Sequence, residues 1–193
     1  MKTEVIAELP TEHGEFQVWA FRSGEEGQPH LVLVSKVLPQ GTPLVRIHSE
    51  CWTGDVVGSL RCDCGEQLRM SLKHIAEEGG ALFYLRQEGR GIGLVEKLKA
   101  YNLQDQGLNT FEANIALGHE EDARSYEMVP QMLKELGWGS VRIMTNNPEK
   151  VRALELAGID VEAVVPVTVN PNQHSHLYHQ AKRELKGHGH IGN

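Results

Sequence analysis

The sequence predicts an α/β fold: a single domain with a mixed β-sheet covered by helices, hairpin-rich in its N-terminal part and βαβ in its C-terminal part. Two observations carry this prediction. Residues 1–50 hold short apolar runs separated by turns, as antiparallel strands do. Residues 141–167 alternate strand, helix and strand, and this order at this spacing implies a right-handed crossover between parallel strands. The length of 193 residues suits one domain.

The N-terminal strands are marked by turns and by alternation. Residues 5–7 and 16–21 are apolar runs that flank a hairpin-like break at residues 10–14. Residues 31–34 form a continuous apolar run of strand length, and residues 44–48 alternate apolar with polar side chains. This alternation places Arg46 and His48 on one face of a strand, just before the first cysteine.

Helical spacing begins after the cysteines. Leu68, Leu72 and Ile75 repeat at the period of a helix, which the glycine pair at 79–80 would end. A strand at 81–85 leads into a glycine-rich loop at 86–93, and a second helix follows over residues 94–103. A third helix is predicted over residues 125–136, bent near Pro130.

The last third predicts one βαβ unit. Residues 141–144 and 161–167 are the two strands. The helix between them begins with Pro148 in its first turn and is stopped by Gly158, which is the usual placement of proline and glycine at helix ends.

Composition restricts the partners. The net charge of −7 argues against a nucleic-acid-binding surface, which is normally basic. The N-terminus lacks the apolar run of a secretion signal, and no window approaches the roughly 20 apolar residues of a membrane span. We therefore expect a cytoplasmic protein that binds neither nucleic acid nor membrane, and whose thiols stay reduced.

All three cysteines, Cys51, Cys62 and Cys64, lie within one short segment with the spacing C-x10-C-x-C. Three thiolates and a fourth position left for water describe an open zinc site. Two alternatives remain: a closed zinc site with His48 as fourth ligand, and metal-free thiols packed as small hydrophobes. A disulfide would leave one cysteine over, and the polar residues around Cys62 and Cys64 are unlike a core, so the spacing favours a metal.

Other polar segments each have two interpretations. The loop at 86–93 suits an anion, because glycines expose backbone N–H groups and Arg86 and Arg90 flank it, but it also suits a tight turn. Asp122 could be functional or an ordinary N-cap, and residues 145–148 could hold a phosphate or cap a helix. Tyr101 could be catalytic or a core residue with a satisfied hydroxyl.

Taken together, these segments resemble GTP cyclohydrolase II, the enzyme family that opens the path to riboflavin. The resemblance covers nearly the whole chain and rests on the order and spacing of many short motifs. They are R-I-H-S-E-C, S-L-R-C-D-C-G, R-Q-E-G-R-G-I-G-L, L-Q-D-Q-G, E-A-N, D-x-R and T-N-N-P, with Lys-Gly-His near residue 188.

The resemblance implies residue roles. Cys51, Cys62 and Cys64 would hold one zinc ion per subunit, with water as fourth ligand. Asp122 would be the proton acceptor, Arg124 the nucleophile toward the α-phosphorus and Tyr101 a catalytic helper. The residues that would contact GTP are Arg46, Glu50, Gln67, Glu88, Gly89, Arg90, Thr110, Thr145 and Lys150.

The resemblance also implies the reaction and its partners. Zinc-dependent hydrolysis would open the guanine imidazole ring at C8 and release formate and pyrophosphate, leaving a diaminopyrimidinone ribosylamino phosphate. Magnesium would accompany the triphosphate, and the active form would be a homodimer. A guanidinium is normally protonated and a poor nucleophile, so a charge-stabilising role suits Arg124 better than a covalent one. Three thiolates donate heavily and damp the acidity of a bound water, so a nearby base or hydrogen bond, such as one from Tyr101, should help.

Two other functions remain open: a related GTP hydrolase that keeps the formyl group, and a non-catalytic nucleotide-binding module stabilised by zinc. Tyr101 argues against the first alternative, because the resemblance gives that position a part in deformylation. The combination of Asp122, Arg124 and Tyr101 beside the cysteines argues against the second. We expect residues 1–170 to form the catalytic domain and residues 171–193 a C-terminal helix or polar, histidine-rich, mobile tail.

Overall fold

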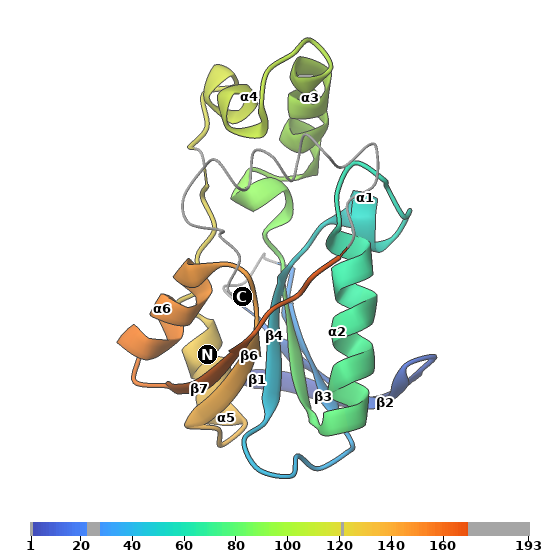
Figure 1. The fold of residues 1–193 in the computed structure, drawn as a ribbon, viewed down its shortest axis with the longest axis vertical. Coiled ribbons are helices and arrows are strands. Elements are labelled where there is room, and N and C mark those ends of the chain that lie inside the picture. Colours follow the sequence, from blue (N-terminus) through green and yellow to red (C-terminus); the bar gives the residue numbers. More distant parts are fainter. Residues whose placement is uncertain (1, 23–27, 121, 170–193) are drawn as a thin grey trace.

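A computed structural model describes residues 2–22, 28–120 and 122–169, the side chains of residues 110 and 111 excepted. Its centre is one seven-stranded sheet in the order β1-β2-β3-β5-β4-β6-β7 (Figure 1). The strands from β1 to β5 in this order pair antiparallel, and those from β5 to β7 pair parallel. The bounds are β1 Thr3–Thr11, β2 Gly14–Phe21, β3 His30–Ser35, β4 Leu44–Ser49, β5 Gly80–Leu85, β6 Ser140–Met144 and β7 Asp160–Val165.

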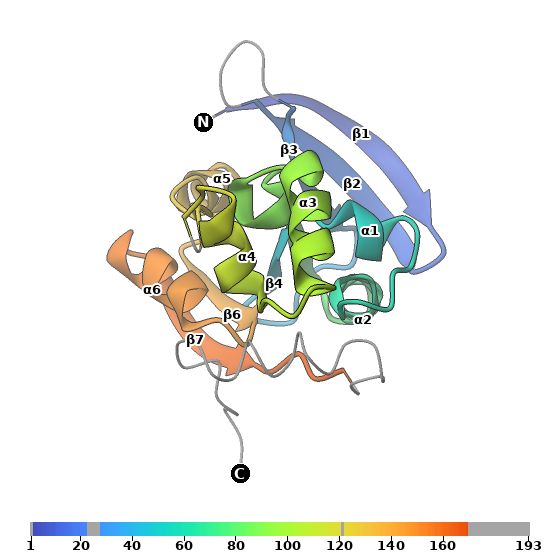
Figure 2. The ribbon, with the colours of Figure 1, turned by 90° about the horizontal axis from the view of Figure 1, so that it is seen from above.

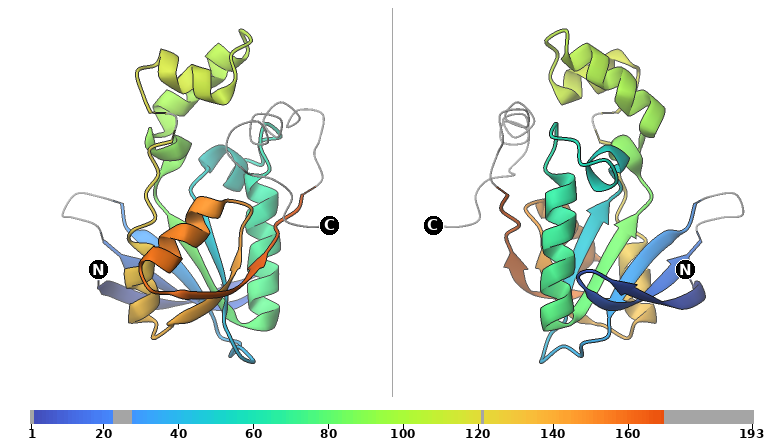
Figure 3. Two further views of the ribbon diagram at one scale, coloured as in Figure 1. Left: turned by 60° about the vertical axis from the view of Figure 1, so that its left-hand side comes forward. Right: turned by 90° about the vertical axis from the view of Figure 1, so that its right-hand side faces the viewer.

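The helices cover both faces of the sheet and one end of it. α2 lies along one face, and α5 and α6 lie on the other (Figure 3). α3 and α4 stand above the carboxyl ends of the parallel strands (Figure 1). The bounds are α1 Trp52–Asp55, α2 Cys64–Glu78, the 3₁₀ turn η1 Glu88–Gly91, α3 Leu94–Gln104, α4 Thr110–Ala116, α5 Val129–Glu135 and α6 Pro148–Leu156.

The predicted fold class is confirmed. The β1–β2 hairpin supplies the antiparallel edge, and β6, α6 and β7 form the predicted parallel βαβ unit (Figure 2). No helix among the described residues has both the length and the apolar character needed to cross a bilayer.

The strand β4 separates two apolar clusters. Val45 and Ile47 face the cluster under α5 and α6, whereas Leu44 faces the smaller cluster under α2. Arg46 and His48 therefore share the α2 side, as predicted, but both are buried. The polar face of this strand is directed into the protein, where it supports the site.

The connections of the parallel strands reverse direction at β4 and β6. From β4 the chain crosses to β5 on one side, and from β6 it crosses to β7 on the other. Ligands in open α/β sheets bind where neighbouring strands send their connections apart, outside the carboxyl ends. The segment that follows Ser49 and the segment that follows Met144 border this crevice.

The region from residue 122 to 136 differs from the prediction. The helix α5 begins at Val129 with Pro130 in its first turn, so the proline starts the helix and does not bend it. Residues 122–126 have no helical structure, and Asp122 is therefore not an N-cap. The short helices α1 and α4 were not predicted, because neither is long enough to show a helical period.

Candidate active site

The three cysteines converge at the end of β4. Cys51 precedes α1, Cys62 lies in the following loop, and Cys64 is the first residue of α2. Their sulfur atoms all lie within 4.8 Å of one another, and the Sγ atoms of Cys51 and Cys62 are 3.6 Å apart. No disulfide joins them in the described chain.

Two glycines allow this convergence. A Cβ on Gly54 would lie 2.9 Å from the Cys62 sulfur and 3.3 Å from the Cys51 sulfur. A Cβ on Gly65 would lie 2.2 Å from the Gly54 carbonyl oxygen, a distance that no real Cβ adopts. α1 and the start of α2 therefore touch backbone to backbone, and their contact holds the cysteines together.

The sulfur cluster fits a tetrahedral metal. A zinc–sulfur bond of about 2.3 Å in tetrahedral geometry places two sulfurs about 3.8 Å apart, close to the distance between Cys51 and Cys62. His48 is not a fourth ligand, because its Nε2 lies 3.0 Å from Asp55 and it is absent from the ligand group. The described residues thus offer three ligands, which is the protein's share of an open site.

Asp55 is the acceptor that fixes this end of the cluster. Its buried carboxylate accepts hydrogen bonds from the Cys51 backbone N–H at 3.0 Å and from the Tyr84 hydroxyl at 2.9 Å, besides its contact with His48. The His48 and Tyr84 rings stack with centroids 5.6 Å apart. Burial lowers the pKa of His48, although Asp55 opposes this, so the imidazole is neutral near pH 7.

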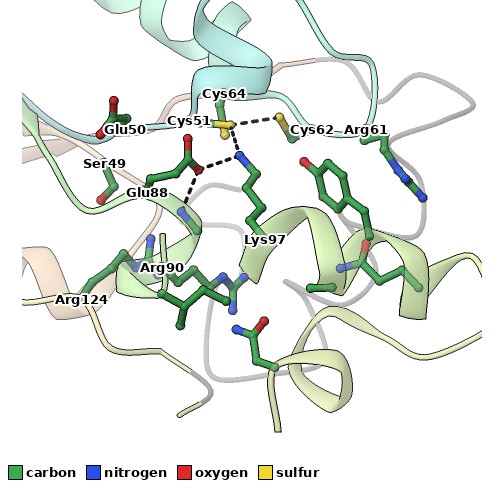
Figure 4. A pocket seen from close by; sticks show the side chains of 16 residues that line it. Ser49, Glu50, Cys51, Arg61, Cys62, Cys64, Glu88, Arg90, Lys97 and Arg124 are labelled. Carbon is green, nitrogen blue, oxygen red and sulfur yellow. Dashed lines mark hydrogen bonds and ion pairs between the residues drawn. The ribbon is translucent and has the colours of Figure 1, made fainter. Parts of the chain in front are cut away.

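Lys97 approaches the cysteines from α3. Its Nζ donates to the Cys51 sulfur at 3.1 Å and to Glu88 Oε1 at 2.7 Å (Figure 4). Glu88 is itself buried, and its carboxylate also accepts the backbone N–H groups of Trp52 at 2.6 Å and Gly89 at 2.7 Å. Glu88 therefore ties three segments together beneath the cluster.

The pKa values of these groups reflect their proximity. Hydrogen bonds from Cys62 and Cys64 lower the pKa of Cys51, and Lys97 adds to this effect. The bonds to Cys51 in turn raise the pKa of Cys62 to about 11 and that of Cys64 well above its usual range. Burial opposes the charge of Lys97, but the Cys51 thiolate and Glu88 outweigh it and raise the pKa of Lys97.

The cluster opens into a cleft between the strand ends and α3. Four cationic side chains, Arg61, Arg90, Lys97 and Arg124, line it (Figure 4). The rest of the wall comes from Ser49, Glu50, Cys51, Cys62, Cys64, Glu88, Gly89, Ile92, Ala100, Tyr101, Gln104 and Asn114. The cleft is cationic although the chain carries a net charge of −7.

The glycine-rich loop adopts left-handed backbone geometry. Gly89, Arg90 and Gly91 have φ values of 61°, 61° and 92°. For Arg90 this conformation is unfavourable, and the two glycines beside it remove the steric cost at their own positions. The Arg90 side chain lies in the cleft wall, so the loop serves the cleft and is more than a tight turn (Figure 4).

Asp122 and Arg124 form an ion pair at the cleft margin. Arg124 Nε donates to Asp122 Oδ1 at 2.8 Å, and a second bond joins the guanidinium to Oδ2. Burial opposes the charge of Asp122, but the hydrogen bonds from Arg124 outweigh it and lower the pKa of the carboxyl. Arg124 lines the cleft, whereas Asp122 is exposed and is not among the lining residues.

Tyr101 stands opposite the cysteines on α3. Its hydroxyl lies 3.3 Å from the Thr53 hydroxyl, and the Arg61 guanidinium covers its ring at 4.6 Å from the centroid. Burial raises the pKa of Tyr101, so the phenol is protonated near neutral pH. Tyr101 is part of the cleft wall and not of the apolar core.

Other residues expected to contact GTP lie behind the cleft wall. Arg46 is buried and donates to the Met144 carbonyl at 2.9 Å and to Gln67 Oε1 at 2.7 Å. The Thr145 hydroxyl accepts the Asn147 N–H at 3.0 Å, and Lys150 donates to the Ile47 carbonyl at 2.7 Å. These four side chains surround the β4–β6 crevice without lining the cleft.

The remaining two residues differ in position. Glu50 does line the cleft, paired with Arg86 at 2.5 Å. Thr110 is the first residue of α4, and its side chain lies outside the described residues. The histidine-rich tail predicted over residues 171–193 is also outside them.

Sequence reasoning did not find Lys97, Asp55 or Arg61. One signal for Lys97 was present, because it precedes Tyr101 by four residues and so shares a helix face with it. Asp55 and Arg61 lie within the cysteine segment itself, but no spacing distinguishes them from ordinary surface charges.

The fold and the site together are an α/β sheet whose strand ends carry three cysteines able to hold a metal ion, beside a cleft lined by four cationic side chains. The family model of GTP cyclohydrolase II matches residues 2–166. The chain therefore belongs to the GTP cyclohydrolase II family.

Two curated relatives illustrate the family. A GTP cyclohydrolase-2 of Shewanella halifaxensis is 48% identical over 184 residues, which cover 94% of this chain and 88% of the relative. A riboflavin biosynthesis protein RibBA of Phocaeicola vulgatus is 46% identical over 186 residues, covering 95% of this chain and 46% of the relative. The chain thus spans about half the length of the RibBA proteins it matches.

Among solved structures, the chain is similar to the two-domain 3,4-dihydroxy-2-butanone 4-phosphate synthase RibBX from A. baumannii. It matches with a TM-score of 0.47 at 21% identity, over 88% of this chain and 40% of that chain. A likeness at this level carries no argument about function.

Proposed function

We propose that the chain hydrolyses GTP, opening the imidazole ring at C8 and releasing formate and pyrophosphate in the first step of riboflavin biosynthesis. The observation that supports this most is the cleft, in which three cysteines and four cationic side chains face the same space. Family membership supplies the substrate, because GTP is the substrate of GTP cyclohydrolase II.

In this proposal Cys51, Cys62 and Cys64 hold one zinc ion per subunit. Thiolate is the ligand that zinc prefers, and zinc bound here would supply a Lewis acid that activates water near neutral pH. Tyr101 lies on the opposite wall with a protonated hydroxyl, and it would hold the guanine ring or donate a hydrogen bond to it.

The triphosphate would be held by the cationic end of the cleft. Arg90 and Arg124 present guanidinium groups that suit phosphate oxygens, and Mg²⁺ would accompany the triphosphate to neutralise the leaving pyrophosphate. Glu50, Glu88 and Gly89 would shape this end, and Arg46, Gln67, Thr110, Thr145 and Lys150 would close the site from the crevice side.

The ion pair between Asp122 and Arg124 suggests a sequence of events. Arg124 is protonated while it bonds Asp122, which disfavours it as a nucleophile and favours charge stabilisation. A phosphate group that draws Arg124 away would remove the cause of the lowered pKa of Asp122. Asp122 would then become a better proton acceptor only when substrate is bound.

The remaining parts of the proposal concern the whole protein. We propose a homodimer that acts in the cytoplasm, with residues 1–170 as the catalytic domain and residues 171–193 as an appended tail. The family name supports the substrate only, so size measurement in solution must test the dimer.

The test is formate release from GTP with zinc content measured on the same samples. Cys62→Ser should lose both zinc and formate release, whereas Asp122→Ala should lose formate release and keep its zinc. Asp160→Ala is the matched control, because Asp160 begins β7 at the opposite end of the strands and is exposed. Full activity in a preparation shown to be free of zinc would refute the proposal.

Product identification separates the alternatives. Equal amounts of formate and pyrophosphate support the proposed reaction. Pyrophosphate without formate would show a hydrolase that keeps the formyl group. Recovery of unchanged GTP from an intact, zinc-loaded sample would leave a nucleotide-binding module.

A further inference from the structure

Lys97 touches a metal ligand and is itself held in place by a buried carboxylate. Its Nζ lies 3.1 Å from the Cys51 sulfur and 2.7 Å from Glu88 Oε1. The Lys97 side chain is 12% exposed and that of Glu88 is 8% exposed, so water competes little with these contacts. Lys97 and Glu88 therefore form a buried ion pair and not a surface one.

The contact between Lys97 and Cys51 offsets the excess negative charge that three thiolates would give a metal site. Three thiolates and a divalent ion sum to one negative charge, and such strong donors reduce the ion's ability to withdraw electrons from a bound ligand. An ammonium hydrogen bond draws electron density from the thiolate that accepts it. The bond from Lys97 to Cys51 therefore makes that thiolate a weaker donor to the metal.

The position of Lys97 is fixed independently of the metal. Glu88 accepts the backbone N–H groups of Trp52 and Gly89 as well as Lys97 Nζ, which holds its carboxylate in place. Trp52 is the residue after Cys51, so the anchor of Lys97 and the metal ligand move together. Lys97 Nζ also lies 5.9 Å from the centroid of the Tyr101 ring.

We propose that Lys97 is a positioning residue that tunes the metal through Cys51, with Glu88 as its anchor. Its ammonium group lowers the donor strength of one of three thiolates and so preserves the Lewis acidity of the ion. This role rests on the metal-dependent reaction proposed above, but it concerns the ligand set alone and can be tested without GTP.

The test uses Co²⁺, which takes tetrahedral thiolate sites as zinc does and gives sulfur-to-cobalt charge-transfer absorption. Removing a hydrogen bond from a thiolate raises the energy of its electrons, so this band should move to longer wavelength in Lys97→Met. Lys97→Gln keeps a neutral donor and should give a smaller shift. Lys99→Met is the matched control on the same helix, since Lys99 is 56% exposed and its ion pair within the described residues is with the neighbouring Glu96.

A band in Lys97→Met at the wild-type position, with cobalt fully bound, would overturn the inference. Should Lys97→Met fail to fold, as judged by circular dichroism, the same criterion applies to Lys97→Gln. A shift of equal size in Lys99→Met would also overturn it, because the effect would then be one of general charge.

Turnover gives a second readout. Formate release should fall by roughly 10- to 100-fold in Lys97→Met, the usual range for groups that hold a metal ligand. Lys97 also lines the cleft, so this loss by itself would not separate tuning from substrate contact. A cobalt shift in a chain that does not turn over GTP would uphold the role of Lys97 and refute the proposed function. Turnover of GTP by the wild-type chain without a cobalt shift in Lys97→Met would uphold the proposed function and refute the role of Lys97.

Discussion

At the scale of single residues, Asp55 joins as many partners in the site as Glu88 does, although it lies outside every motif. One buried carboxylate accepts from the Cys51 N–H and the Tyr84 hydroxyl and contacts the His48 ring. These partners come from β4, β5 and the start of α1. Asp55 thus joins the sheet to the metal segment.

Replacing Asp55 by alanine should be costly. Three buried polar groups would lose their partner, and each unsatisfied group costs about 1–3 kcal/mol, so the free energy of unfolding should fall by about 3 kcal/mol or more. Tyr84→Phe removes one of the three bonds and leaves Asp55 paired, so it should cost about 1 kcal/mol. Denaturant unfolding at saturating zinc measures the free energy of unfolding of both variants. Equal losses in the two variants would contradict the conclusion that Asp55 is the shared acceptor of three buried groups.

Residue types predict ligands better than they predict supporting residues. The three cysteines stand out because their number and spacing are unusual, and the structure brings them together. Lys97 does not stand out, because a lysine on a polar helix normally faces solvent. Its burial arises only when α3 packs against Glu88 and Cys51, which is a tertiary contact that no local pattern encodes.

At the scale of elements, the site depends on how α1 meets α2. Gly54 and Gly65 bring the two helices into backbone contact, and the cysteines lie on either side of that contact. α1 has four residues, too few to be stable as an isolated helix. Its position therefore comes from this contact and from the acceptor groups of Asp55 and Glu88.

Gly65→Ala should separate these helices. The new Cβ would meet the Gly54 carbonyl oxygen at 2.2 Å, and backbone cannot yield as a flexible side chain does. We expect the bound zinc per chain to fall well below one while the sheet still folds. Gly139→Ala is the matched control, because the described chain has no atom within 4 Å of a Cβ there. Normal zinc content in Gly65→Ala, measured by metal analysis, would disprove the requirement.

Helix ends were the least predictable elements. Pro130 lies within a run of helical spacing, which led to the prediction of a helix from residue 125 bent at the proline. In the structure residues 122–126 are not helical: the Ser125 N–H donates to Gln87 Oε1, and Arg124 pairs with Asp122. Side-chain contacts with another segment decided the outcome, and the local sequence does not contain them.

At the scale of the whole molecule, the cysteine cluster and the larger apolar core are separate. All three cysteines lie within residues 51–64, whereas the larger apolar cluster lies between the sheet and the helices α5 and α6. The two clusters hold the large, fully buried side chains such as Phe16, Phe21 and Phe83. The core therefore has a source of stability that does not involve the metal.

Removing the metal should abolish formate release from GTP without unfolding the protein. After chelation we expect an unchanged far-ultraviolet circular dichroism spectrum at 25 °C, together with faster amide hydrogen exchange in residues 51–67. Zinc at one hundred times its dissociation constant should add about 2.7 kcal/mol to the free energy of unfolding. Cooperative unfolding on chelation would instead support the module in which zinc is structural.

The class of fold could be predicted from the chain, and the order of its strands could not. Hairpin signals and a βαβ unit were enough for a mixed sheet. The insertion of β5 between β3 and β4 depends on pairing between segments about fifty residues apart, such as Leu31 with Tyr84. This pairing creates the crevice at β4 and β6, so the location of the site follows from the part of the fold that is least evident in sequence.

The contact between the glycine-rich loop and the segment at 122–124 has an evolutionary consequence. The Ala123 N–H donates to the Arg90 carbonyl at 3.0 Å, and a Cβ on Gly91 would lie 2.9 Å from the Ala123 carbonyl oxygen. Neither segment can shift or gain bulk unless the other yields. We therefore expect homologues that change the backbone path at one of these segments to change it at the other, so that positions 89–91 and 122–124 vary together.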